Sequence, residues 1–383
     1  MNLLRFITLL LVGQLFVLDV HANESIINQE LIKKIEKSYC LAENWFINNI
    51  KEDGSFNYLY DPLSRKYSKK NNMIRQLMAS RLLAELSHER DELKNLHKRN
   101  LKAIFKFWYK IDDKGRGFII FNGKSKLGAN AMALRTILYS PFYAKYQKQT
   151  HQLLKTILSA VNNDYSLQPW FVEPPYSYNH DYLLTFYSGE AILSLAEYYS
   201  KTEDPQILKI AIKIQDYYIE KYVNQMDYNY YPAYVPWHTM SMFKLFELTG
   251  DKNYIDAIFK LNNKLLKLLD TNEFVGRFYN KEYPFYGKPH SSSDGVYTES
   301  IAYALKAALI MKNKNLIQFY KNSIELSYQN LSSLQYTETN LYSNDYLVGS
   351  FKIKKSSDIV RLDSNQHIMD AYRAILSIGT GVN

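Results

Sequence analysis

Cysteine is almost absent from this sequence. Of 383 residues only Cys40 is a cysteine, so an intramolecular disulfide and a zinc site built from cysteines are both excluded. Glycine and proline are also few, at 14 and 10 residues, and most of them separate helical blocks. Alternation typical of strands is scarce, whereas apolar residues recur with a helical period nearly throughout. The chain is therefore predicted to be all-α.

Long apolar runs are lacking as well, except at the N-terminus. The stretch MNLLRFITLLLVGQLFVLDVHA has one basic residue, Arg5, then a largely apolar stretch from 6 to 18, and it ends on Val20-His21-Ala22. The apolar part is too short to span a bilayer, and the pattern is typical of a cleaved secretory signal peptide, residues 1–22. We expect an exported protein, periplasmic or secreted, that has no membrane span.

The net charge of +9 comes from lysines scattered among helix faces, without a dense basic run. Such a distribution favours solubility, although a basic exported protein could also be drawn to anionic glycans. The sequence has no nucleic-acid-binding motif, no glycine-rich phosphate loop and no HExxH-like spacing. We therefore expect no nucleic-acid partner, no cofactor and no metal.

Start and stop signals divide the helical pattern into twelve segments. Asp204-Pro205 offers a cap followed by proline, and Gly250-Asp251 ends one helix and caps the next. The predicted helices are 26–50, 72–88, 91–109, 127–140, 143–163, 183–200, 204–223, 236–249, 251–270, 295–311, 313–333 and 364–379.

The even-numbered helices of this series begin alike. A polar residue comes first, Met or Ile stands two positions later, and small residues are frequent beside them. The six polar residues are Gln76, Asn130, Glu190, His238, Glu299 and His367. Their spacing accommodates one helix pair and a loop each time, so the chain is predicted to contain six repeats.

Small residues let the even-numbered helices pack on both sides, as an inner ring requires, while the odd-numbered helices have the charged face of an outer ring. The predicted fold is an (α/α)6 barrel, a double-layered toroid of six inner and six outer helices, formed as one domain by residues 23–383. All connections from outer to inner helices are long. They therefore share one end of the barrel, where the six polar residues are expected to face one cavity.

Five segments carry a resemblance to known proteins: NNMIRQ, FYSGEAILSLAEYYSKTED, WHTMSMFKLFELTGDKNY, DGVYTESIAYALKAA and NQHIMDAYRAIL. With them the chain resembles the six-hairpin (α/α)6-toroid proteins of sugar metabolism. These include N-acylglucosamine 2-epimerases, unsaturated-glucuronyl hydrolases and the helical domain of glucuronyl C5-epimerases. The resemblance implies a carbohydrate ligand in a sugar-sized pocket at the N-termini of the inner helices. In the 2-epimerase group, histidines that act as acid and base occupy the positions of His238 and His367. The resemblance implies the same role for these two residues.

Two kinds of chemistry remain open for this pocket. Hydrolysis of a glycoside needs a proton donor and a second carboxylate roughly 5–10 Å away, and Glu190 and Glu299 are the candidates, with Asp181 and Asp294 in adjacent loops. Each carboxylate could instead cap a helix.

Epimerisation or β-elimination needs an acid and a base near neutral pH, a role that suits His238 and His367. Arg75 could bind a substrate carboxylate in bidentate fashion, or it could pair with Glu190 or Glu299. His290, in a long loop, could also touch the ligand.

Aromatic residues concentrate in the loops 168–182 and 226–238. Their faces can stack on sugar rings or simply pack over the barrel mouth. The expected substrate-binding residues are Arg75, Gln76, Asn130, Glu173, Trp170, Tyr176, Tyr187, Tyr231 and Trp237.

The sequence therefore predicts a monomeric, exported glycoside hydrolase that acts on a glycan, acidic glycans included. The alternatives are a sugar epimerase or uronic-acid lyase, and a glycan-binding or host-interaction protein without catalysis.

Overall fold

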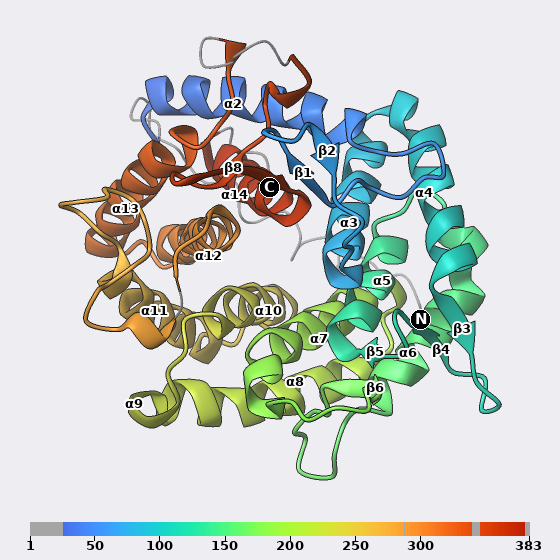
Figure 1. The fold of residues 1–383 in the computed structure, drawn as a ribbon. Coiled ribbons are helices and arrows are strands. Elements are labelled where there is room, and N and C mark those ends of the chain that lie inside the picture. Colours follow the sequence, from blue (N-terminus) through green and yellow to red (C-terminus); the bar gives the residue numbers. More distant parts are fainter. Residues whose placement is uncertain (1–25, 287, 339–344, 380–383) are drawn as a thin grey trace, which may run out of the picture.

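Twelve long helices form two concentric rings in the structure of this protein, a computed structural model that describes residues 26–286, 288–338 and 345–379. The inner ring, seen end-on in Figure 1, consists of α3 (Met73–Glu89), α5 (Leu127–Leu138), α7 (His180–Thr202), α10 (Tyr234–Thr249), α12 (Ser291–Ile310) and α14 (Leu362–Gly379). The outer ring consists of α2 (Gln29–Asn48), α4 (Lys94–Phe107), α6 (Gln147–Leu158), α8 (Pro205–Ile219), α11 (Asn253–Leu265) and α13 (Lys314–Ser332). The predicted (α/α)6 toroid and its alternation of inner and outer helices are confirmed.

The predicted signal peptide, residues 1–22, lies outside the described residues. Within them, none of the helices combines the length and the apolarity needed to cross a membrane.

Burial separates the two rings. Every residue of α5 is buried, from Leu127 to Leu138, because this helix packs against neighbours on all sides and its small residues allow close approach. The outer helix α11 instead buries one stripe, which includes Tyr254, Ile258, Leu261 and Leu265. That spacing is one face of a helix with 3.6 residues per turn.

The helix boundaries follow local chemistry. The Asp204 side chain accepts a hydrogen bond of 3.0 Å from the backbone N–H of Gln206, and Pro205 occupies the first turn of α8. Gly250 ends α10 in a left-handed conformation, at φ 72°, which glycine adopts without a steric penalty. Both boundaries agree with the sequence signals.

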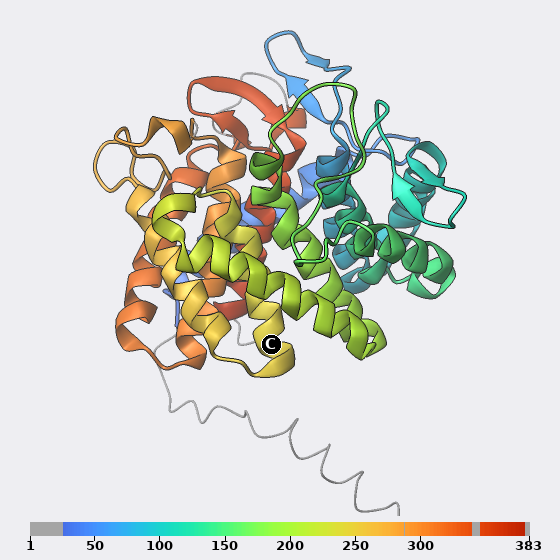
Figure 2. The same cartoon turned by 90° about the horizontal axis from the view of Figure 1, so that it is seen from below.

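The long connections gather at one end of the barrel, the upper end in Figure 2, and they contain short strands that the sequence did not suggest. Two antiparallel pairs are β3 (Tyr109–Ile111) with β4 (Gly117–Ile119) and β5 (Ser125–Lys126) with β6 (Trp170–Val172). A four-stranded antiparallel sheet has the order β2-β1-β8-β7 and is formed by β1 (Leu59–Asp61), β2 (Lys66–Tyr67), β7 (Lys352–Lys354) and β8 (Ser357–Arg361). Short helical segments complete the chain at Asp91–Leu93, Tyr143–Tyr146, Glu220–Asn224, Met226–Asn229, Leu266–Leu268, Pro284–Tyr286 and Asp345–Leu347.

The ring closes between its first and last inner helices. Arg81 of α3 forms an ion pair with Asp370 of α14, and the Arg75 Nε lies 2.9 Å from the Asp363 Oδ2. Strands β1 and β8 pair above the same junction. We call these contacts between α3 and α14, together with the β1–β8 pair, the closure seam.

Candidate active site

A cavity of about 560 Å³ lies at the end of the barrel where the inner helices begin, as expected from the distribution of long loops. Its polar lining includes Glu190 of α7, Asp363 and His367 of α14, and Arg75 of α3. Tyrosines from α7, α12 and the long loops form much of the wall. We call this the upper cavity.

Glu190 is one of two buried carboxyl groups in the described lining of the upper cavity. It is 1% exposed, and its Oε2 has no hydrogen-bond partner. Burial raises the pKa of Glu190 to about 8, although the charges of Arg135 and Lys126 act in the opposite direction. Near neutral pH its carboxyl group is therefore largely protonated, which is the state that a proton donor needs.

A glycine makes room for this carboxyl group. A Cβ atom added at Gly128 of α5 would lie 2.1 Å from the Glu190 Oε2 and 2.7 Å from the Tyr187 Cδ1. The Glu190 side chain thus occupies space that any other residue at position 128 would fill.

Asp363 is a site residue that sequence analysis missed. It is buried, and it contacts the Arg75 Nε at 2.9 Å and the Arg361 Nε and Nη2 at 2.5 and 2.8 Å. Burial alone would raise the pKa of Asp363, but the two guanidinium groups outweigh burial and hold that pKa below its usual range. The only sequence signal was an aspartate two positions after an arginine, directly before the predicted start of the last inner helix. Arg75 therefore pairs with Asp363, and not with Glu190 or Glu299.

Two histidines line the upper cavity. His367 stands one turn after Asp363, and its Nδ1 has no hydrogen-bond partner. The His290 Nδ1 accepts a hydrogen bond of 3.1 Å from the backbone N–H of Ser293. Burial lowers the pKa to about 3 for His367 and to about 4 for His290. Both imidazoles are therefore neutral near neutral pH.

Four of the polar residues at inner-helix starts hold the long loops in place. Gln76, Asn130, Asp294 and Asn365 are each the fourth residue of their helix. Each side-chain oxygen accepts a hydrogen bond from a loop backbone N–H. The donors are Phe56 at 3.0 Å, Ile119 at 2.7 Å, Phe278 at 3.1 Å and Phe351 at 3.0 Å.

These four contacts, which we call the loop latches, are buried. Gln76 and Asn130, predicted to bind substrate, and Asp294, predicted to be catalytic, do not line the upper cavity. Their common position reflects a shared structural contact, because a buried loop N–H needs an acceptor.

His238 and Asp181 also lie away from the upper cavity. His238 is 1% exposed; its Nε2 is 2.8 Å from the Ser188 hydroxyl and its Nδ1 is 3.2 Å from the Gln215 amide. Both ring nitrogens are thus committed to structural contacts. Asp181 is exposed, and it forms an ion pair of 2.8 Å with Lys221.

Glu299 lines a different cavity. This second cavity, about 290 Å³, lies toward the C-terminal ends of the inner helices, and Trp237 lines both cavities. We call it the lower cavity. Glu190 and Glu299 are therefore not brought together in one cavity, because Glu299 is the ninth residue of α12 and stands about two turns below its start.

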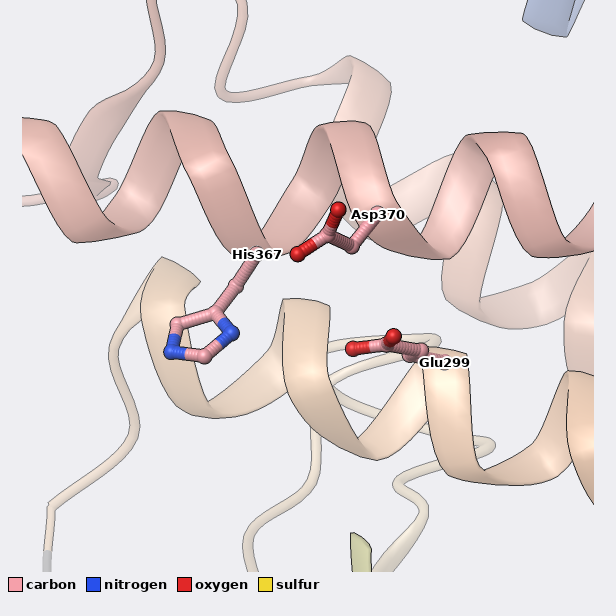
Figure 3. Close-up of side chains that lie close together, drawn as sticks. All are labelled: Glu299, His367 and Asp370. Carbon is pink, nitrogen blue, oxygen red and sulfur yellow. The ribbon is translucent and has the colours of Figure 1, made fainter. Parts of the chain in front are cut away.

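One cluster could hold a metal ion. Ligand atoms of Glu299, His367 and Asp370 lie within 4.8 Å of one another, and Figure 3 shows the three side chains pointing toward a common space between α12 and α14. However, Asp370 also accepts from the Arg81 guanidinium and from the Gln366 amide. Arg81 thus already supplies positive charge to this cluster.

The predicted aromatic wall is present in part. Tyr187, Tyr231 and Trp237 line the upper cavity. Trp170 is buried behind it against Tyr178, at 4.8 Å between ring centroids. Tyr176 and Glu173 are exposed and do not line it.

Further wall residues come from α7, α12 and the loop before α12. They are Tyr182, Phe186, Tyr279, Tyr283, Tyr286 and Tyr297. Segment 278–297 is rich in aromatic residues, like the loops 168–182 and 226–238. The same sequence signal could therefore have identified it as part of the cavity wall. Three cations, Arg75, Lys126 and Lys288, also line the cavity.

Comparison with known proteins points in one direction. The profile of the family described as "Beta-L-arabinofuranosidase, GH127 catalytic domain" matches residues 143–274. A search of curated protein sequences finds no significant match.

Solved structures match over nearly the whole chain. The unsaturated glucuronyl hydrolase of a Bacillus species is 11% identical, with a TM-score of 0.67 over 91% of this chain and 97% of its own. A D-mannose isomerase is 10% identical, with a TM-score of 0.67 over 93% and 100%. An α-1,6-mannanase of a Salegentibacter species, in complex with α-1,6-mannotriose, is 12% identical, with a TM-score of 0.64 over 91% and 99%. The predicted resemblance to the six-hairpin (α/α)6-toroid proteins is thereby confirmed, and the chain shares their fold.

Proposed function

We propose that this protein is a carbohydrate-processing enzyme, a glycoside hydrolase that works in the upper cavity. The observation that carries the proposal is a pair of carboxyl groups whose pKa values are shifted in opposite directions. Glu190 is held protonated by burial and Asp363 is held ionised by two arginines. Opposed shifts of this kind are how one site provides an acid and an anionic carboxylate at the same pH.

In the proposed reaction Glu190 donates its proton to the oxygen of the leaving sugar as the glycosidic bond breaks. Asp363 stabilises the positive charge that develops at the anomeric carbon, either by attacking that carbon or by activating water. Asp363 thus takes the place that sequence analysis gave to Glu299. The matched mannanase, glucuronyl hydrolase and arabinofuranosidase families support this reaction class.

The lining of the upper cavity favours an acidic sugar. Arg75, Lys126 and Lys288 contribute three positive charges, while a protonated Glu190 leaves Asp363 as the one ionised carboxylate of the described lining. Lys126 lies over the rings of Trp170 and Tyr187, at 5.7 and 6.0 Å from their centroids. A uronic acid would offer its carboxylate to these cations and its ring face to the tyrosines.

A second candidate function is isomerisation or epimerisation by proton transfer. Two neutral histidines, His290 and His367, line the same cavity, and a D-mannose isomerase is among the matched folds. A neutral imidazole can remove a proton beside a carbonyl group. In this version His290 replaces His238, whose ring nitrogens both have structural partners.

Site-directed variants distinguish these functions. Turnover would be measured on mannan oligosaccharides, glycosaminoglycan disaccharides, arabinofuranosides and free mannose. We expect Glu190→Gln and Asp363→Asn each to lower kcat by roughly 10²–10⁴-fold, while Asp181→Asn, a matched change of an exposed carboxylate, leaves kcat unchanged.

Other outcomes select other functions. If both cavity variants keep full turnover and His367→Gln abolishes it, the isomerase version stands instead. If no substrate is turned over but Tyr187→Ala abolishes sugar binding, the protein is a binding protein.

The pH dependence gives an independent check of Glu190. Because the proton donor must be protonated, kcat/KM is expected to fall above about pH 8. An alkaline limb several pH units lower would argue against Glu190 as the acid.

We also propose that residues 1–22 direct export of the chain. The short apolar stretch and the small residues before position 23 support this. Expression in a bacterial host, followed by N-terminal sequencing of the exported protein, should give a chain that starts at Asn23; retention of the uncleaved chain in the cytoplasm would refute it.

A further inference from the structure

The lower cavity contains polar groups that the fold does not use. Glu299, Tyr303 and Lys306 lie at positions i, i+4 and i+7 of α12, so they share one face of that helix, and all three line the cavity. Within the described residues, none of the three forms a hydrogen bond or an ion pair. The Lys306 ammonium lies over the Tyr303 ring, at 4.9 Å from its centroid.

The hydrogen-bonding capacity of these side chains is not used within the described part of the fold. Glu299 is 7% exposed, whereas Tyr303 and Lys306 are half-buried along the wall of the cavity. A ligand in the cavity can therefore form hydrogen bonds with all three side chains.

The charges around this row are balanced. Five basic and five acidic residues line the lower cavity, and several are already paired. Arg135 makes two hydrogen bonds of 2.7 Å with the Glu197 carboxylate, and Lys244 lies 3.2 Å from Glu247. A strongly charged ligand would disturb this balance, so a neutral polar molecule fits best.

The remaining lining suits a sugar ring. Trp237, Phe243 and Tyr303 offer aromatic surface, with the rings of Phe243 and Tyr303 at 5.4 Å. A volume of about 290 Å³ lies at the lower end of the range for small-molecule pockets, roughly 300–1,000 Å³. The lower cavity can therefore hold one ring but not an oligosaccharide. Lys244 and Arg373, each partly exposed, stand at its mouth.

We propose that the lower cavity is a second binding site, which takes a neutral monosaccharide-sized polyol from the short-loop end of the barrel. Glu299, Tyr303 and Lys306 would hydrogen-bond its hydroxyl groups, and Trp237 would separate it from the upper cavity. This site is independent of the proposed hydrolase reaction, since neither Glu190 nor Asp363 lines it.

A matched pair of plugging variants tests the proposal. Val296 lines only the upper cavity and Ser377 lines only the lower one, so Val296→Trp and Ser377→Trp should each fill one of them. Binding of D-mannose, D-glucose and L-arabinose to the full chain would be measured by calorimetry, after thermal melting has shown that each variant is folded.

We expect at least one of these sugars to bind the lower cavity of Val296→Trp with the same affinity as in the parent chain. Ser377→Trp should not bind that sugar in the lower cavity. Tyr303→Phe, which removes only a hydroxyl group, should weaken that binding by roughly tenfold. The proposal is overturned if no sugar binds Val296→Trp, or if Ser377→Trp and Tyr303→Phe leave sugar binding unchanged. Turnover in the upper cavity, measured on the same variants, reports separately on the hydrolase.

Discussion

At the scale of single residues, the site depends on carboxyl groups kept away from their ordinary protonation states. Glu190 has a pKa near 8 in the folded chain against 4.5 as an unperturbed group. The folded state therefore keeps a proton that the unfolded state releases between these two pH values. The stability that this proton contributes is complete below pH 4.5, and it is lost as the pH rises to about 8.

Glu190→Gln should remove this pH dependence. The variant and the parent are expected to be similarly stable near pH 4.5. Between pH 4.5 and 8 the free energy of unfolding of the variant should rise relative to that of the parent, by a few kcal/mol at most, since one pKa unit corresponds to about 1.4 kcal/mol. Urea unfolding between pH 4.5 and 8.5 measures the difference. A constant difference across this range would show that Glu190 titrates normally.

Gly128→Ala should impair chemistry more than folding. The added methyl group would displace the Glu190 and Tyr187 side chains, and a displacement of about 1 Å at a reacting group can lower kcat by roughly 10²-fold. Alanine is meanwhile about 1 kcal/mol more favourable than glycine within a helix, so the melting temperature should not fall by much. Kinetics and thermal melting on the same preparation check both parts. Full activity in this variant would mean that the position of Glu190 is not critical.

At the scale of elements, two inner helices approach each other backbone to backbone. A Cβ atom at Gly295 of α12 would lie 2.9 Å from the Ile368 nitrogen and 3.0 Å from the His367 carbonyl carbon of α14. The obstacle is main chain, which cannot rotate away as a side chain can. The spacing of α12 and α14, and with it the place of His367, therefore depends on this glycine.

Gly295→Ala should push α12 and α14 apart and destabilise the fold by about 1–3 kcal/mol. Activity should fall as well, because α14 contributes Asp363 and His367 to the upper cavity. Gly115→Ala serves as the control. It lies in open space at φ 71°, and its cost is limited to about 1–2 kcal/mol for the left-handed backbone, with activity kept. Equal effects on activity from the two changes would contradict this account.

The elements were predictable from sequence to a greater extent than the site. All twelve helices were predicted, because periodicity, caps and glycine stops act locally. The short strands were not predicted, since segments such as 59–61 and 357–361 pair only after the ring has brought them together.

The polar residues at the inner-helix starts misled for a related reason. Sequence analysis aligned Glu190, Glu299 and His367 with Gln76 and Asn130, although the structural repeat is the fourth helix residue, which is Asp294 in α12 and Asn365 in α14. Whether a polar side chain faces a loop or a cavity depends on how many residues separate it from the start of its helix. The predicted helix starts were uncertain by a few residues, so the sequence could not distinguish the two orientations. Asp363 was missed because the last helix begins two residues before its predicted start.

At the scale of the whole molecule, the barrel is held closed by buried charges. The closure seam includes Arg81, which contacts both Glu85 and Asp370 with little exposure. Removing one partner of a buried ion pair leaves an uncompensated charge, and this typically costs about 3–5 kcal/mol. This contact joins the first inner helix to the last, so its two partners lie far apart in sequence although their helices are neighbours in the ring.

Asp370→Asn should therefore destabilise the entire ring by about 3–5 kcal/mol, in one cooperative transition seen equally by circular dichroism and tryptophan fluorescence. Glu273→Gln, which removes an exposed ion pair with Lys281, should leave the unfolding midpoint unchanged. Two separate transitions in the Asp370→Asn variant would mean that the barrel melts by sectors.

The meeting of α2 and α14 has a consequence for the order of the polypeptide. Gly379 at the end of α14 packs against Ile32 near the start of α2, so a short linker could connect these two helices. New termini could then be opened at Gly250, where a short turn faces open space. Such a circular permutant would preserve every contact within both rings. The barrel should then fold in the same way wherever the polypeptide begins.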